Sequence, residues 1–248
     1  MALKWCPGII TKKHVWADGL FTLSVKVDGV REFQPGQFLQ IGHQASDEHV
    51  HRPYSVASPW GETLEFFVVR VNEGQLTPWL WELQVGDALD VNHRAAGSFT
   101  LGKAPDAEVL WLIATGTGLA PYVAMLRTEE PWQRYQKIVV VHGVRLAQDL
   151  AYVKEFEDLA TKYGSKFSYI PALTREQSAG MLTGRIPALL KDGTLEDCAN
   201  STMTADNCAI MLCGNPAMLD DMESYLETRS MKRHRSKSPG QIVLERYW

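Results

Sequence analysis

The stretch VLWLIATGTGLAPY, residues 109–122, predicts the fold of the second half of the chain. It opens with an apolar run, 109–114, that has the length of a buried strand. Gly116 and Gly118 let the backbone approach a ligand closely, and Pro121 suits the first turn of a helix, where its missing N–H is not needed. A strand leading through such a loop into a helix is typical of a parallel sheet and offers an anion site, although a Gly-x-Gly pair alone also fits a tight turn.

The residues that follow this stretch alternate between strand and helix patterns. Apolar runs at 137–143, 167–174 and 208–214 are typical of further buried strands. The segment 151–164 has the pattern of an amphipathic helix that ends at its glycine. We expect its buried side to consist of Val153, Phe156, Leu159, Ala160 and Tyr163. Alternation of this kind predicts a parallel sheet with helices on both faces.

The first hundred residues carry the pattern of short strands instead. Residues 20–27 alternate apolar and polar side chains as a half-buried strand does, and residues 63–71 form another strand. Residues 33–42 predict a strand interrupted by a Pro-Gly turn, and residues 83–91 place a Gly-Asp turn before a further strand. The segment DEHVH, 47–51, is interpreted as a polar loop, because two imidazoles and flanking acids do not complete a metal site.

The two patterns together predict a two-domain fold. Short strands at this spacing favour a closed antiparallel β-barrel, which is followed by an α/β parallel-sheet nucleotide-binding domain. The boundary falls near 101–108, so we expect the domains at 1–101 and 102–248.

Composition narrows the class of protein. The 248 residues are 45% apolar and 22% charged, as in an ordinary soluble protein, and the net charge of −4 argues against bulk binding of nucleic acid. No apolar run is long enough for a membrane span, and the amino end lacks the features of a signal peptide. The four cysteines form no CxxC pair and lack the spacing of a plant-type iron–sulfur cluster, so we expect a reduced, cytoplasmic protein without a cluster of its own.

The glycine loop differs from the dinucleotide-binding fingerprint. The third glycine position is Pro121, and no acid ends the next strand, where an NAD-binding unit carries one about 20 residues on. Arginines stand after the strands instead, as Arg145, Arg175 and Arg185. A guanidinium fork suits a 2′-phosphate, so the pattern favours NADP over NAD. Three solvated loop arginines are the alternative.

Four short motifs carry a family resemblance. They are RPYS at 52–55, GTGLAPY at 116–122, CGNP at 213–216 and the terminal YW at 247–248. In this order, along nearly the whole chain, they resemble the ferredoxin–NADP reductase family, and most closely its short bacterial ferredoxin/flavodoxin–NADP reductases. The resemblance implies FAD between the two halves and NADP on the second. An Arg-x-Tyr-Ser sequence alone would more often be only a strand end.

The resemblance also implies roles for the first half. Arg52 would bind the FAD pyrophosphate, Tyr54 would stack on one face of the flavin, and Ser55 would place its hydroxyl near flavin N5. The other FAD contacts that it implies are Pro53, Phe67, Val68, Val69, Arg70, Gln75, Leu76, Thr77 and Thr117.

Roles in the second half and at the carboxyl end follow in the same way. Tyr247 would cover the second flavin face, Trp248 would stack near the adenine, and Cys213 would lie beside the nicotinamide. A hydrophobic anchor and a small buried residue are the alternatives for the carboxyl end and for Cys213. The implied NADP contacts are Val144, Arg145, Thr174, Arg175, Arg185, Asn215 and Asp221, and the implied catalytic group is Tyr54, Ser55, Cys213 and Tyr247.

The implied activity is electron transfer between NADPH and ferredoxin or flavodoxin through FAD. An acidic partner of this kind could dock on the basic segment Arg229, Lys232, Arg233, Arg235 and Lys237, although most charge runs are simply solvated. Two other functions stay open. One is an NADH-dependent reductase module for a cytochrome or oxygenase, and the other is a flavin-binding sensor without catalysis.

Overall fold

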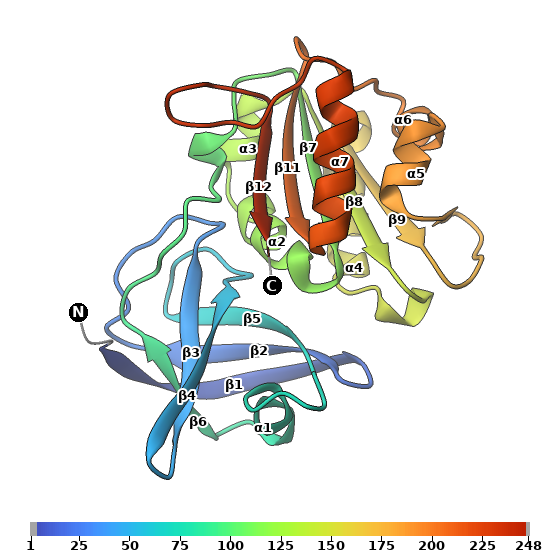
Figure 1. Ribbon diagram of the computed structural model, residues 1–248. Coiled ribbons are helices and arrows are strands. Elements are labelled where there is room, and N and C mark those ends of the chain that lie inside the picture. The colour runs from blue at the N-terminus through green and yellow to red at the C-terminus, as the bar shows by residue number, and fades with distance from the viewer. Residues whose placement is uncertain (1–3, 247–248) are drawn as a thin grey trace. The chain divides into compact units, whose positions relative to one another are not determined.

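The computed structural model describes residues 4–246 and divides into two compact units (Figure 1). The first unit comprises the chain up to Thr100 together with Ala120–Thr128, and the second comprises Leu101–Leu119 and the chain from Glu129 onward. Helix α2 (Ala120–Leu126) therefore packs with the first unit although it follows a strand of the second. The division into 1–101 and 102–248 stays a prediction.

The first unit is an antiparallel barrel. Its sheet has the strand order β4-β3-β6-β1-β2-β5. An isolated antiparallel bridge between Val56 and Phe66 joins the chain after β4 to β5 and so connects the two ends of the sheet. The strands are β1 (Trp5–Ala17), β2 (Leu20–Val27), β3 (Phe38–Ala45), β4 (Glu48–Ser55), β5 (Thr63–Val69) and β6 (Ala88–Asn92). The predicted fold of the first half is confirmed.

The barrel interior is filled by alternate residues of these strands. Phe21, Leu23 and Val25 of β2 are fully buried, and Leu80 of the short helix α1 (Thr77–Glu82) packs into the same core. The prediction that β2 is only half-buried is wrong, because Thr22 is also covered. The Trp16 indole N–H donates a 2.9 Å hydrogen bond to the Thr22 hydroxyl, so the outer face of β2 lies under an aromatic side chain.

Two further predictions for the first unit need correction. The Pro-Gly turn predicted within 33–42 is present, with φ +99° at Gly36, but no strand precedes it and β3 begins only at Phe38. The segment DEHVH is not a loop, since Glu48 begins β4. His49 lies in that strand, 2.7 Å from the Asp90 carboxylate and stacked on Trp5 at 4.0 Å between ring centroids, so barrel contacts account for the histidine.

The second unit is built on a parallel sheet with the order β10-β9-β8-β7-β11-β12. The chain starts in the middle, at β7, adds three strands on one side and then returns to add two on the other. Ligands bind such a sheet at the point where the strand order reverses, beyond the carboxyl ends of the strands. The strands are β7 (Val109–Thr115), β8 (Lys137–Val144), β9 (Phe167–Leu173), β10 (Leu182–Thr183), β11 (Cys208–Gly214) and β12 (Ile242–Arg246).

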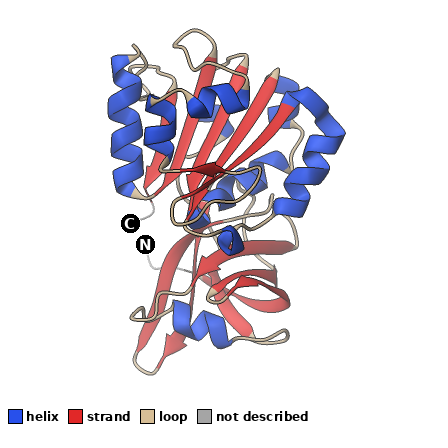
Figure 2. Ribbon diagram, turned by 90° about the vertical axis from the view of Figure 1, so that its right-hand side faces the viewer, coloured by secondary structure: helices blue, strands red, loops and turns tan. Residues whose placement is uncertain are grey.

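Helices cover both faces of this sheet, as predicted (Figure 2). One core joins alternate strand residues such as Trp111 and Val141 to α5 (Ile186–Lys191), α6 (Thr194–Ala199) and α7 (Pro216–Thr228). On the other face, Phe156 of α4 (Val153–Tyr163) packs against Tyr169 of β9. The expected buried side of α4 is wrong at Ala160, which is exposed.

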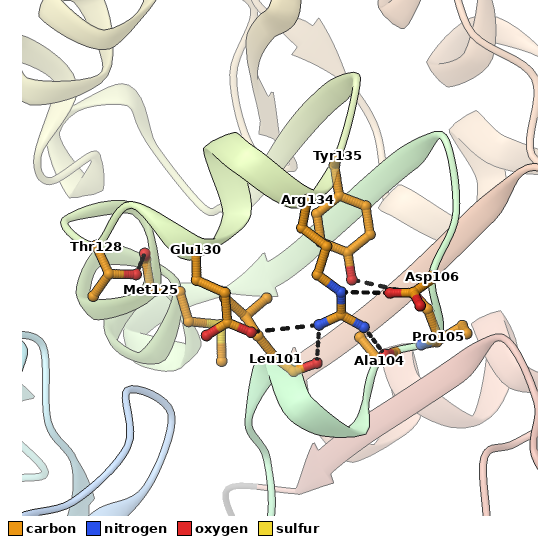
Figure 3. Close-up of polar contacts among 9 residues, drawn as sticks. All are labelled: Leu101, Ala104, Pro105, Asp106, Met125, Thr128, Glu130, Arg134 and Tyr135. Carbon is orange, nitrogen blue, oxygen red and sulfur yellow. Dashed lines mark hydrogen bonds and ion pairs between the residues drawn. The ribbon is translucent and has the colours of Figure 1, made fainter.

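The segment that leads into β7 is held by one arginine (Figure 3). Arg134, in α3 (Glu130–Arg134), donates to the Asp106 carboxylate at 2.8 Å and to the Leu101 carbonyl at 2.6 Å, and it also donates to the Ala104 carbonyl. The Tyr135 hydroxyl adds a 3.2 Å bond to the Pro105 carbonyl. These contacts fix the position from which β7 starts. None of the helices within residues 4–246 combines the length and the apolar character that crossing a bilayer requires.

Candidate functional site

Strand β4 carries the first group of candidate residues. Arg52 is exposed and lies opposite Ile41 of β3. Its guanidinium donates to the His51 carbonyl at 2.7 Å, and its other terminal nitrogen lies 3.5 Å from the side-chain oxygen of Gln75. The structure therefore brings together two residues that are 23 positions apart and that the sequence assigned to the same ligand. No carboxylate among the described residues forms an ion pair with Arg52, which leaves its guanidinium available to an anion.

Tyr54 and Ser55 follow on the same strand. The Tyr54 ring packs against the barrel core. Burial raises the pKa of Tyr54 to about 12, against the opposing effect of Arg52, so the phenol is neutral at physiological pH. Ser55 is buried and pairs with Phe38 of β3. A neutral aromatic ring thus stands two residues after an exposed cation, as stacking on a planar ring and binding of an adjoining phosphate both require.

The remaining first-unit candidates divide into buried and exposed residues. Phe67 and Val68 are buried, with Val68 inside the barrel core, whereas Val69 is exposed. Val68 can therefore contact a ligand only through its backbone. The Arg70 guanidinium lies over the Trp81 ring, 5.1 Å from its centroid, and 3.5 Å from the Asp18 carboxylate.

The loop before α1 holds the last candidates of this unit. Leu76 is buried in the barrel core, while Pro53 and Gln75 are exposed on the neighbouring segments. The Thr77 hydroxyl accepts from the Val71 N–H at 2.8 Å and donates to the Val71 carbonyl at 3.2 Å. The hydroxyl of Thr77 thus closes this loop on itself.

The glycine loop of the second unit is a turn of 3-10 helix, Gly116–Leu119. Gly116 has φ +53° and open space where a β-carbon would stand, so its backbone conformation, and not crowding, favours glycine. Gly118 differs, because a β-carbon there would lie 2.7 Å from the carbonyl oxygen of Cys213 at the end of β11. The loop therefore packs closely against the end of β11, at the point where the strand order of the sheet reverses. Thr117, between the two glycines, is buried.

The CGNP motif continues from β11 into α7. Cys213 is fully buried near the carboxyl end of β11, next to Gly118. The Asn215 N–H donates to the Thr115 hydroxyl at 2.8 Å, and its side-chain oxygen accepts from Ala217 N–H at 2.9 Å. Asn215 therefore caps α7, which leaves only the nitrogen of its side-chain amide for a ligand. Asp221, on α7, is exposed.

The three arginines follow neighbouring strands of the parallel sheet. The Thr174 N–H donates to the Val144 carbonyl at 3.1 Å, and the Arg175 N–H donates to the Arg145 carbonyl at 3.0 Å. These bonds join the ends of β8 and β9, and a 2.8 Å bond from Gly184 to Leu173 joins the turn after β10 to β9. The side chains of the three arginines, Arg145, Arg175 and Arg185, are exposed. No carboxylate within residues 4–246 forms an ion pair with any of the three.

The basic segment is less uniform than its sequence indicates. Arg229 is half-buried, and its guanidinium forms a 3.0 Å ion pair with Glu196. The backbone of Arg233 forms an isolated parallel β-bridge with Ile242 of β12. Lys232, Arg235 and Lys237 are exposed. Tyr247 and Trp248, which the sequence assigned to FAD, lie outside the described residues.

One polar residue of the site was missed by sequence reasoning. His142 is fully buried in β8, and its Nε2 lies 3.0 Å from the carbonyl oxygen of Gly116 in the glycine loop. The signal was present in the sequence, since KIVVVHG places one histidine in an otherwise apolar strand. Its partner could not be read there, because the two residues are 26 positions apart and Gly116 lies in the loop after a different strand, β7.

Comparison with known proteins connects these two groups of residues. The model of the oxidoreductase FAD-binding domain matches residues 8–99, and that of the oxidoreductase NAD-binding domain matches residues 112–224. The chain is 41% identical over 246 residues to a flavodoxin/ferredoxin–NADP reductase of Escherichia coli (strain K12), covering 98% of this chain and 99% of that protein.

The chain belongs to the flavodoxin/ferredoxin–NADP reductase family.

Other members of this reductase family agree over similar lengths. A ferredoxin–NADP reductase of Pseudomonas aeruginosa is 34% identical, with 94% of this chain and 93% of that protein covered. The crystal structure of a ferredoxin NADP+ reductase from Neisseria gonorrhoeae with bound FAD and NADP superimposes with a TM-score of 0.93 at 28% identity, covering 100% of both chains. The predicted family and fold are confirmed.

The donor groups present fit the two cofactors that this reductase family uses. An exposed guanidinium next to a neutral tyrosine ring is the chemistry that a flavin with a pyrophosphate requires, and the first unit provides it in Arg52 and Tyr54. The second unit provides a glycine loop at the point where the strand order reverses. It also provides arginines after the successive strands β8, β9 and β10 that pair with no carboxylate of the described chain. These groups fit a nucleotide that carries an additional phosphate.

Proposed function

We propose that this chain is a reductase that moves electrons between NADPH and ferredoxin or flavodoxin through FAD. The observation that carries the proposal is the group of three exposed arginines at the ends of adjoining parallel strands, none paired with a carboxylate of the described chain. Unpaired like charges held at one edge repel one another, and a bound phosphate relieves this repulsion. Family membership across almost the full length supports the same function.

The first unit supplies the groups that hold FAD. We assign Arg52 to the pyrophosphate, Tyr54 to one face of the flavin ring and the Ser55 hydroxyl to a hydrogen bond with flavin N5. Gln75 would keep the Arg52 side chain in place, since the two lie 3.5 Å apart. The neutral state of Tyr54 suits stacking, because a phenolate would repel the electron-rich reduced ring.

The second unit supplies the nucleotide site. We assign Arg145, Arg175 and Arg185 to the 2′-phosphate, and the glycine loop to the part of NADPH that leads to the nicotinamide. Cys213 stands at the carboxyl end of β11, against that loop. FAD, when bound, supplies the chemistry that joins a two-electron donor to a one-electron acceptor, while the chain positions both cofactors and excludes water.

The two matched domain models support the division into a cofactor domain at 1–101 and a nucleotide domain at 102–248. None of the four cysteines, all within the described residues, forms a disulfide, which suits the reducing, cytoplasmic setting that we propose. For the protein partner, we propose an acidic ferredoxin or flavodoxin that docks over the exposed Lys232, Arg235 and Lys237.

The proposal is tested by an absorbance spectrum of the purified protein, followed by anaerobic addition of NADPH or of NADH. We expect flavin absorbance that NADPH bleaches much faster than NADH. Equal bleaching by both nucleotides would instead favour an NADH-dependent reductase module. A flavin that neither nucleotide reduces would favour a sensor, and a colourless protein that FAD cannot reconstitute would end the proposal.

A further inference from the structure

His142 is a buried histidine that the proposed function does not use. It lies near the carboxyl end of β8, opposite Ala114 of β7 and Pro171 of β9, and it has no exposed surface. A buried imidazole destabilises a fold unless its nitrogens are hydrogen-bonded. Both nitrogens of His142 have partners. Nε2 lies 3.0 Å from the Gly116 carbonyl oxygen and Nδ1 lies 3.3 Å from the Tyr169 hydroxyl.

The partners decide where the proton of His142 resides. A carbonyl oxygen only accepts hydrogen bonds, so Nε2 must carry the proton and donate to Gly116. Nδ1 is then the acceptor, and the Tyr169 hydroxyl donates to it. The result is a directed chain of hydrogen bonds from Tyr169 on β9, through His142 on β8, to the glycine loop after β7.

This chain of hydrogen bonds is uncharged at neutral pH. Burial lowers the pKa of His142 to about 4, although the bond to Gly116 acts in the opposite direction. Burial also raises the pKa of Tyr169 above its usual range. The neutral imidazole is the form that donates at Nε2 and accepts at Nδ1, so the environment stabilises the form that the geometry needs.

The bond to Gly116 fixes the orientation of one peptide group in the loop. In a trans peptide the N–H of a residue points opposite to the carbonyl of the residue before it. Since the Gly116 carbonyl points at His142, the N–H of Thr117 points away from His142. Outward N–H groups attract an anionic ligand, whereas an outward carbonyl oxygen would repel it. Gly116 has φ +53°. Glycine has little intrinsic preference for this backbone conformation over others, so an external contact is needed to hold it.

We propose that His142, held by Tyr169, is a positioning residue that keeps the Gly116 carbonyl turned into the sheet and the glycine loop ready for the nucleotide. The inference rests on the proposed function, because it takes NADP as the ligand of this loop. It concerns only the part of the ligand at β7. The arginines that we assign to the 2′-phosphate follow β8, β9 and β10.

This separation provides the test. Adenosine 2′,5′-bisphosphate carries the 2′-phosphate but lacks the nicotinamide half, so it probes the arginines without requiring the loop. We would titrate the FAD-loaded protein and its variants with NADP+ and with this half-ligand by calorimetry. For His142→Leu we expect NADP+ to bind at least about tenfold more weakly, the size of effect that loss of one buried hydrogen bond produces. The half-ligand should change less than about twofold.

Three further variants separate positioning from general destabilisation. In His142→Gln the amide N–H can donate to Gly116, so much of the NADP+ affinity should return. Tyr169→Phe removes only the hydroxyl and should weaken NADP+ binding by about threefold, which keeps the test available if His142→Leu does not fold. Val140→Ala is the matched control, since Val140 lies two residues earlier on the same face of β8 and is also fully buried. Its NADP+ affinity should equal that of wild type.

Unchanged NADP+ affinity in both His142→Leu and Tyr169→Phe would overturn the inference, as would equal losses for NADP+ and the half-ligand. A wild-type protein that binds neither ligand would instead overturn the proposed function.

Discussion

Gly118 lies against Cys213 so closely that a β-carbon on the glycine would stand 2.7 Å from the carbonyl oxygen of the cysteine. The contact joins the loop after β7 to the end of β11, where the sheet changes direction. Because the obstacle is backbone and not the end of a flexible side chain, it cannot move aside cheaply.

Gly118→Ala should therefore destabilise the second unit. We expect the free energy of unfolding to fall by about 2 kcal/mol or more, as in other overpacked buried sites, and NADP+ affinity to fall with it. Thermal and denaturant unfolding would measure the first effect. Gly61→Ala is the control, because a β-carbon at Gly61 meets no atom within 4 Å. Equal melting temperatures for the two variants would contradict the close approach.

The arginine group predicts a selective effect on the two nicotinamide nucleotides. Arg175→Ala should raise KM for NADPH roughly ten- to thirtyfold and leave KM for NADH nearly unchanged, since only NADPH carries the 2′-phosphate. Steady-state diaphorase assays with both nucleotides would measure the ratio. Arg31→Ala, another exposed arginine that lies in the first unit, should leave both constants as in wild type. Parallel losses for NADPH and NADH would show that Arg175 does not select between them.

The exposed cations of the basic segment predict an effect that depends on the electron acceptor. The double variant Arg235→Glu and Lys237→Glu should slow ferredoxin reduction at low salt and leave ferricyanide reduction intact. The difference from wild type should shrink as salt rises, because exposed charges are screened within about 10 Å at 0.1 M. Lys12→Glu with Lys26→Glu makes the same change of net charge on the first unit. A similar slowing of ferredoxin reduction in that control would contradict docking at the basic segment.

The lowered pKa of His142 predicts a specific loss of stability in acid. Burial holds this pKa at about 4 in the folded protein, against 6.5 for an ordinary histidine. The unfolded chain then binds a proton that the folded chain does not, so this contribution is complete above pH 6.5 and is lost as the pH falls towards 4. Its full size is about 3 kcal/mol.

Denaturant unfolding across pH 4–6.5 would measure this contribution as a difference between variants. His142→Gln has no titrating group at the position, so its free energy of unfolding should fall less steeply with acid than that of wild type. Val140→Ala should retain the wild-type slope. If the curves of wild type and His142→Gln run parallel, His142 is not held neutral by burial.

Local pattern predicted most of the strands correctly. The apolar runs at 109–114, 137–143 and 208–214 became β7, β8 and β11, because fully buried parallel strands need nothing but apolar residues of the right length. The segment DEHVH failed for the opposite reason. Its polar side chains are accommodated by Trp5 and Asp90, which come from other strands and which a local pattern does not show.

The arginines that follow successive strands were visible in the sequence, since a parallel sheet brings carboxyl ends to one edge whatever the side chains are. By itself the sequence thus determined the two kinds of sheet, the family and the residue types at each strand end. Only the tertiary structure decided which of these residues touch. The Arg52–Gln75 contact, the Asn215 cap and the chain from Tyr169 through His142 to Gly116 depend on strand order and register, which long-range packing sets and neighbouring residues do not.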